Sequence, residues 1–217
     1  MDLAEFFADR AALYQLLARL YMYPLTAEVL SLVAGLSIEQ SLLEEYQSVY
    51  EGLTIMQKAT VGIKDLSLLV DALNCEATRL FEGPGQPLAP PYGSYYLNGK
   101  RLMGPEAIAV REIYIASQML PNAELHQPPD HLALELSFLA ALAADPKTDT
   151  VYQMRHFIAE HIFPWFQVWK EDVLAVKPHP FFVGLVKFTQ MTIDEDLAWL
   201  SEYDSMLSPD ITGELER

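Results

Sequence analysis

The stretch from Leu132 to Ala144 constrains the fold more than any other part of the sequence. Apolar residues recur so densely there that, in a helix, they would cover nearly the whole circumference. A helix that is apolar on all sides must be surrounded by other elements. Because no segment of four to eight residues alternates apolar and polar positions as a half-buried strand does, those elements are expected to be helices too. The sequence predicts an all-α fold with this helix, capped by Asp130, at its centre.

The other helices are predicted from apolar spacing, capping residues and breakers. They cover about residues 3–21, ended by Pro24; 26–34, capped by Thr26 and stopped by Gly35; 37–50, opened by a Ser37–Gln40 capping box and closed by Gly52; 65–81, capped by Asp65 and ended by Gly83 and Pro84; 105–119, with Pro105 first; 148–161; a helix opening at Pro164; and 180–206. Arg10 interrupts the first apolar stripe and is expected at its edge. Together these segments favour a single compact multi-helix domain over residues 1–217, with a hinge-like linker at 121–129.

The composition is that of a globular protein, with 51% apolar and 20% charged residues, and no apolar run approaches the roughly 20 residues that a bilayer span needs. Asp2, Glu5 and Asp9 stand where a secretory signal would carry cations. We therefore expect a cytoplasmic protein that is not integral to a membrane. The single cysteine, Cys75, suits a reducing compartment and is expected to be a small core residue.

The net charge is strongly negative: 14 Lys and Arg against 30 Asp and Glu give 14 − 30 = −16. Nucleic acid is an unlikely partner for such a chain, because binding to phosphates needs clustered cations. A basic partner fits better. Acidic residues also crowd the C-terminal end, and about residues 206–217 are expected to form a solvated acidic tail.

A segment rich in proline and tyrosine follows the helix that ends near Phe81. It holds four of the fourteen prolines and three closely spaced tyrosines, Tyr92, Tyr95 and Tyr96. Proline fixes backbone angles, and tyrosine offers apolar area together with a hydroxyl, so the segment suits binding better than catalysis. The alternative is a rigid loop whose tyrosines fill the core.

Asp130, His131 and Glu135 form the most prominent polar group, with His131 and Glu135 four residues apart on one helix face. Asp130 or His131 could line a pocket beside the tyrosines, or His131 and Glu135 could form a structural pair. The three could also bind a metal, although no second histidine or cysteine pair completes a zinc set. The glycines before Lys100 are too far apart for a phosphate-binding loop, and no GxSxG, HExxH or GxGxxG motif occurs. An enzyme is therefore not expected, nor are a metal or a cofactor.

Five motifs in order resemble the TorD/DmsD family over about residues 1–190, and its DmsD branch in particular. They are Leu80-Phe81 with Gly83-Pro84, Pro90-Pro91-Tyr92-Gly93-Ser94, Asp130-His131, His161 to Trp165, and His179-Pro180-Phe181. The resemblance implies an all-helical cytoplasmic chaperone that binds the twin-arginine signal peptide of a molybdenum-cofactor reductase of the DMSO/TMAO type. Such a chaperone delays export until cofactor insertion and folding are complete, with transient contact with the export machinery.

The same resemblance implies where the peptide binds. The implied peptide-binding residues are Leu80, Phe81, Pro90, Pro91, Tyr92, Ser94, Tyr96, Asp130 and His131, with Tyr21 a looser match. Ala77, Gly85 and Tyr92 stand where DmsD-like proteins often carry tryptophan, so cargo preference is open. One alternative is a chaperone that acts on the body of a nitrate or formate enzyme subunit. A more distant one is a small metal- or nucleotide-dependent enzyme that uses Asp130, His131 and Glu135.

Overall fold

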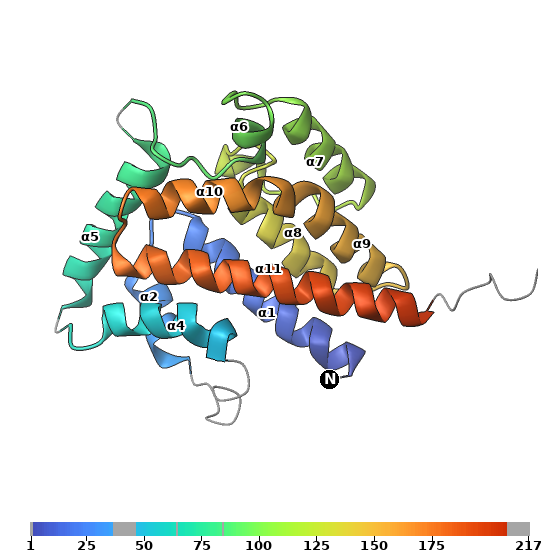
Figure 1. Cartoon of the computed structure of the whole chain (residues 1–217), viewed down its shortest axis with the longest axis horizontal. Coiled ribbons are helices and arrows are strands. Elements are labelled where there is room, and N and C mark those ends of the chain that lie inside the picture. Colours follow the sequence, from blue (N-terminus) through green and yellow to red (C-terminus); the bar gives the residue numbers. More distant parts are fainter. Residues whose placement is uncertain (1, 37–46, 64, 84, 208–217) are drawn as a thin grey trace, which may run out of the picture.

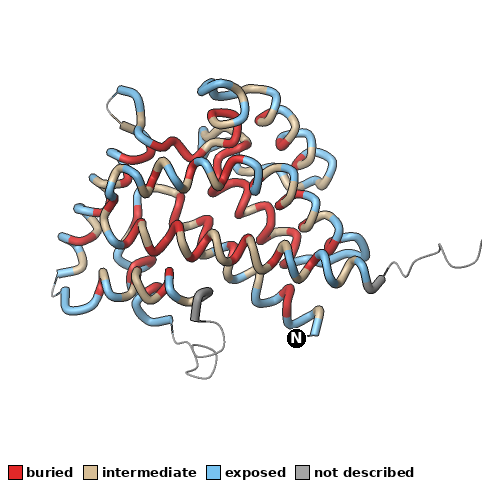
Figure 2. The backbone as a smooth tube through the Cα atoms, viewed as in Figure 1, coloured by how far each residue is buried: buried red, intermediate tan, exposed pale blue. Residues whose placement is uncertain are grey.

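Helix α8 (Leu132–Ala144) is buried on nearly every side, as its apolar circumference predicts. In the computed structural model, which describes residues 2–36, 47–63, 65–83 and 85–207, it lies behind the long C-terminal helix (Figure 1). The buried residues cluster along the middle of the molecule and the exposed ones around its outside (Figure 2). The described residues therefore form one compact domain around a continuous core.

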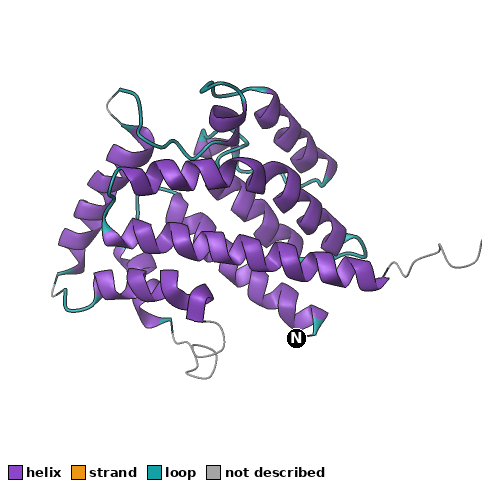
Figure 3. Ribbon diagram, in the orientation of Figure 1, coloured by secondary structure: helices purple, strands orange, loops and turns teal. Residues whose placement is uncertain are grey.

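Nine further α-helices lie in the described ranges. They are α1 (Leu3–Tyr21), α2 (Ala27–Gly35), α4 (Gln47–Thr60), α5 (Leu66–Ala77), α6 (Gly93–Leu97), α7 (Pro105–Ala116), α9 (Thr150–Phe157), α10 (Phe163–Ala175) and α11 (Pro180–Leu207). Two π-helical turns, Thr78–Glu82 and Ile158–Ile162, continue α5 and α9, and a short 3-10 helix covers Ala123–Leu125. Within the described residues only helices and loops occur (Figure 3), so the all-α prediction is confirmed.

Several predicted helix ends are confirmed by their capping contacts. The Thr26 side chain accepts a hydrogen bond from the Val29 backbone N–H at 3.4 Å, and the Asp65 carboxylate accepts one from the Ser67 N–H at 2.9 Å. Pro105 is the first residue of α7. The predicted Ser37–Gln40 capping box and most of the acidic tail lie outside the described residues, and the hinge at 121–129 stays a prediction.

Gly52 does not close a helix, contrary to the sequence prediction, because α4 continues to Thr60. It lies instead where α4 crosses α11. A Cβ on Gly184 of α11 would come within 2.6 Å of the Gly52 carbonyl oxygen and 2.8 Å of the Met56 backbone nitrogen. The two glycines thus let two helix backbones approach closely. In the sequence, a glycine with this role looks the same as a glycine that ends a helix.

Replacing Gly184 by alanine is expected to destabilise the protein by about 2 kcal/mol. Alanine would gain about 1 kcal/mol of helix propensity, but backbone atoms cannot yield as a flexible side chain does, and overpacking costs about 1–3 kcal/mol or more. Urea denaturation measures the difference. Gly35→Ala is the control, since a Cβ there meets nothing within 4 Å, and equal stability of the two variants would contradict the close crossing.

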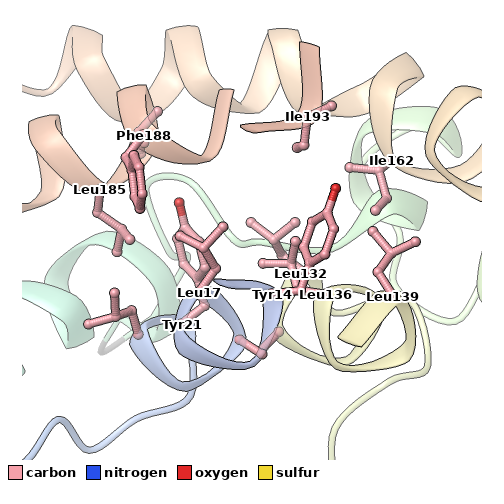
Figure 4. Close-up of a cluster of buried hydrophobic side chains, with 14 of the residues drawn as sticks. Tyr14, Leu17, Tyr21, Leu132, Leu136, Leu139, Ile162, Leu185, Phe188 and Ile193 are labelled. Atoms are coloured by element: carbon pink, nitrogen blue, oxygen red, sulfur yellow. The ribbon is translucent and has the colours of Figure 1, made fainter. Parts of the chain in front are cut away.

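Helix α1 lies beside α8, and side chains of both helices meet those of α11 in the core (Figure 4). The Tyr14 hydroxyl donates to Oδ2 of Asp196 at 2.8 Å, and Nε of Arg10 lies 2.5 Å from Oδ1 of the same carboxylate. Asp196 is fully buried, whereas the Arg10 side chain is 17% exposed, which agrees with its predicted place at the edge of the apolar stripe. The first helix and the last are therefore joined by a buried ionic contact.

Two other expectations concern single features. Cys75 is exposed on α5, so the prediction that it is a core residue is wrong. None of the helices that the structure describes has the length and hydropathy that crossing a bilayer requires.

Candidate functional site

The proline- and tyrosine-rich segment meets the Asp130–His131 corner in space. Tyr92 and His131 form an isolated antiparallel bridge, and their rings lie 4.9 Å apart, edge to face. The Leu132 N–H donates to the Pro91 carbonyl at 2.9 Å, and the Gly93 N–H donates to the Asp130 carbonyl at 3.0 Å. Two segments about 40 residues apart in the chain are thus held together by their backbones.

Helix α6, which the sequence did not predict, begins at this junction. The Ser94 N–H, in its first turn, donates to Oδ2 of Asp130 at 2.5 Å. A Cβ on Gly93 would lie 3.0 Å from Nε1 of Trp165, closer than an ordinary contact, so glycine lets the segment pack closely on α10. The hydroxyl of Tyr92 donates to Oε1 of Gln127 at 2.8 Å, which ties the segment to the linker before α8.

Most of the predicted peptide-binding residues are buried, and only two are partly open to solvent. Tyr92 and Tyr96 are half-buried, with the ring of Tyr96 stacked on Trp165. The buried members next to the junction are Pro90, Pro91, Ser94, Asp130 and His131. A ligand can therefore reach the two tyrosine rings directly, while the other residues set the shape beneath them.

Leu80, Phe81 and Tyr21 belong to the core, so these three of the implied peptide-binding residues are not exposed at the surface. Phe81 packs on Trp169 and Phe182, and the Tyr21 hydroxyl contacts that of Thr189 at 3.0 Å. These residues hold the neighbouring segment in place from the core. The Leu80 carbonyl, for example, accepts a hydrogen bond from the Ala89 N–H at 2.7 Å, just before Pro90 and Pro91. Contact between these three side chains and a peptide stays a prediction that would need a rearrangement.

His131, not Asp130, caps α8, which corrects the predicted start of that helix. Nδ1 of His131 accepts the Ala133 N–H at 3.1 Å, while Asp130 turns its carboxylate toward Ser94. Burial lowers the pKa of His131 to about 3, so the ring is neutral at physiological pH and can accept this hydrogen bond.

The predicted His131–Glu135 pair is also absent from the structure. Both carboxyl oxygens of Glu135, Oδ1 of Asp130 and Oγ of Ser94 are buried without a hydrogen-bond partner. Burial raises the pKa of Glu135 well above its ordinary value, and the charges of Asp130 and Glu106 add to the shift. Glu135 therefore keeps its proton to higher pH than an exposed glutamate does, and these buried polar atoms are left with unused hydrogen-bonding capacity.

Replacing Glu135 by methionine is expected to stabilise the protein at pH 7 by about 1–3 kcal/mol, the cost of leaving a buried polar group unsatisfied. Between pH 4.5 and the raised pKa of Glu135, the folded chain holds a proton that the unfolded chain has released, so wild-type stability falls as pH rises through this window. The variant should lack that slope. Denaturation between pH 5 and 8 tests this, and a less stable variant at pH 7 would contradict it.

Three polar side chains near the tyrosines were missed by sequence reasoning. The first is Glu82, which is exposed. Burial raises the pKa of Tyr92 to about 12, and the negative charge of Glu82 adds to this shift. Burial likewise raises the pKa of Tyr96, with the charge of Asp172 on α10 as the next cause. Gln127 is the third. The charge of one carboxylate thus acts on each half-buried tyrosine, but these residues carry no motif and only the fold brings them together.

No three His, Cys, Asp or Glu side chains converge as metal ligands would in the part of the chain that the structure describes. The site instead consists of two partly exposed tyrosine rings, Tyr92 and Tyr96, next to a buried contact in which the backbones of Pro91–Gly93 and Asp130–Leu132 are hydrogen-bonded. The charges of Glu82 and Asp172 act on these tyrosines. These features suit recognition of a polypeptide and contain no activated nucleophile.

Comparisons with known proteins assign the chain to a family and identify relatives that are named as chaperones. A family model described as nitrate reductase delta subunit matches residues 55–171, more than half of the chain, so the chain belongs to that family. The chaperone protein TorD of Vibrio cholerae is 27% identical over 210 residues, which span 89% of this chain and 92% of TorD. The Tat proofreading chaperone DmsD of Salmonella typhimurium is 28% identical over 116 residues, 53% of this chain and 55% of DmsD.

A solved structure of a proposed redox enzyme maturation protein from Archaeoglobus fulgidus has the same fold. It superposes with a TM-score of 0.53 at 19% identity and covers 84% of this chain and 93% of that one. The resemblance to TorD/DmsD chaperones and the helical fold that it implied are confirmed. The named relatives are chaperones and not enzymes, which supports the non-enzymatic prediction.

Proposed function

We propose that this protein is a cytoplasmic chaperone that binds the twin-arginine signal peptide of a molybdenum-cofactor reductase of the DMSO/TMAO type. Binding would delay export until cofactor insertion and folding are complete. The observation that carries the proposal is the junction between Tyr92 and His131, which presents Tyr92 and Tyr96 half-exposed above buried polar groups. The names of the TorD and DmsD relatives support the same function.

A twin-arginine peptide offers two guanidinium groups followed by an apolar segment, and the site has matching chemistry. Arginine stacks on aromatic faces, which contributes about 0.5–1 kcal/mol at an exposed site, and Tyr92 and Tyr96 supply such faces. Glu82 and Asp172 lie near these rings. Because an exposed ion pair adds only about 0–1 kcal/mol, these contacts orient the arginines, and the apolar segment must supply most of the affinity.

Truncation of one exposed ring tests this assignment. Tyr92→Ala is expected to weaken binding of a twin-arginine peptide about tenfold, since it removes the ring and its contact with Gln127. Isothermal titration calorimetry measures the affinity. Tyr152→Ala, at a tyrosine 51% exposed on α9, is the matched control and should bind as wild type does. The proposal fails if wild type binds a scrambled peptide of the same composition equally well.

The alternative, a chaperone for a nitrate or formate enzyme that holds the enzyme body, is favoured by one observation. The matching family model is described as the nitrate reductase delta subunit. The two functions differ in what the protein retains. Capture of a reductase precursor with and without its signal peptide separates them, because a body-binding chaperone retains both forms and a signal-binding chaperone loses the shortened one.

A further inference from the structure

A second cavity lies beside the candidate site and has no role in the function proposed so far. Its volume is about 360 Å³, within the roughly 300–1,000 Å³ range of small-ligand pockets. It opens between the segment Met119–Leu125, which follows α7, and α8. The lining residues are Met119, Leu120, Pro121, Asn122, Leu125, Leu134, Ser137, Phe138 and Ala141.

This cavity adjoins the Tyr92–His131 junction along α8 and along the linker, although no residue of the junction lines it. Along α8, positions 131, 134, 138 and 141 follow helical spacing, so the pocket side of α8 continues from the His131 cap toward its C-terminal end. On the linker, Leu125 lines the cavity and Gln127, two residues on, accepts the hydrogen bond from Tyr92. The two sites are neighbouring parts of one surface.

The uncharged, mostly apolar lining of the cavity and the negative charge of the protein indicate which kind of ligand would bind there. None of the residues that line the cavity is charged. Leu120 and Leu125 are 62% and 39% exposed, so part of the lining is apolar surface that nothing in the described structure covers. A fatty acid or another anionic amphiphile would find no cation in the lining and a chain of net charge −16 around it. An apolar peptide segment attached to a cationic one fits both features.

We propose that this cavity holds the apolar segment that follows the arginine pair of the signal peptide. The inference rests on the proposed function and extends it, because it assigns the two parts of one peptide to two adjoining sites. The arginines lie at Tyr92 and Tyr96, and the apolar side chains enter between α8 and the linker. Affinity then depends on this cavity more than on the carboxylates.

The test uses two peptides, one with adjacent arginines before an apolar segment and one in which serine and glycine replace that segment. Wild type is expected to bind the first at least about tenfold more tightly, the equivalent of about 1.4 kcal/mol. Ala141→Trp, which fills the cavity, and Leu120→Asp, which makes its exposed wall polar, should each remove this difference. Both variants should leave binding of the polar peptide unchanged.

Ile108→Asp provides the matched control, since Ile108 is 57% exposed on α7 and does not line the cavity. It should bind both peptides as wild type does. Leu120→Asp keeps the test valid if Ala141→Trp fails to fold, because Leu120 is largely exposed. Wild-type affinity for the apolar peptide in both cavity variants would overturn the cavity assignment and leave the proposed function standing. If wild type binds neither peptide, the proposed function falls as well.

Discussion

Replacing Trp169 by alanine is expected to lower the free energy of unfolding by about 3–5 kcal/mol, the range for truncating a large buried aromatic side chain. Trp169 is fully buried, and its ring packs against those of Phe81, Tyr21 and Phe166. Its indole N–H also donates to the Ala89 carbonyl at 3.0 Å. The substitution therefore removes core packing and a contact that holds the chain just before the site.

Chemical denaturation followed by circular dichroism measures this loss. Val168→Ala is the control on the same helix, because Val168 is 51% exposed and its truncation should change stability by about 0.5 kcal/mol or less. Trp169→Phe keeps most of the packing and removes the hydrogen bond, so its loss should be smaller than that of alanine. A loss below about 1 kcal/mol for Trp169→Ala would show that α10 does not anchor the segment before Tyr92.

Replacing Asp196 by alanine is expected to cost about 2–4 kcal/mol. Breaking a buried ion pair from one side costs about 3–5 kcal/mol, and the partial exposure of Arg10 reduces this figure because water can solvate the remaining cation. The Tyr14 hydroxyl, fully buried, would also lose its acceptor. Helices α1 and α11 should separate more easily.

Urea denaturation of Asp196→Ala and Glu202→Ala makes the comparison, since Glu202 is an exposed acid on the same helix. The Glu202 variant should match wild type. Tyr14→Phe removes one hydrogen bond and should cost about 1 kcal/mol. If Asp196→Ala is as stable as the Glu202 variant, the buried contact does not hold α1 against α11.

The helices could be predicted from the sequence because their signals are local. The apolar circumference of residues 132–144, the Thr26 and Asp65 caps and Pro105 all act within a few residues of where they stand. Gly52 was misread because a glycine that ends a helix and one that admits a neighbouring helix have the same sequence signature. Only the position of Gly184 distinguishes them.

The candidate site was harder to predict from the sequence, because it is formed by contacts between segments that are far apart in the chain. Resemblance to a known family, and not residue spacing, indicated that Tyr92 and His131 belong together. The burial of Leu80 and Phe81 follows from the packing of α10 and α11 around them, which apolar spacing alone cannot distinguish from an exposed patch. The proximity of Glu82 to Tyr92 likewise depends on the path of the loop between them.

Mapping of peptide contacts by NMR tests most directly whether the tyrosine segment and the start of α8 form one receptor. Backbone amide signals would be followed while a peptide with adjacent arginines and an apolar segment is added. We expect the largest shift changes at Tyr92–Tyr96 and Gln127–Leu132, the segments joined by the hydrogen bonds described above, and at Met119–Leu125, the segment that lines the neighbouring cavity. Changes confined to α4 and α5, or no changes at saturating peptide, would contradict the proposed site.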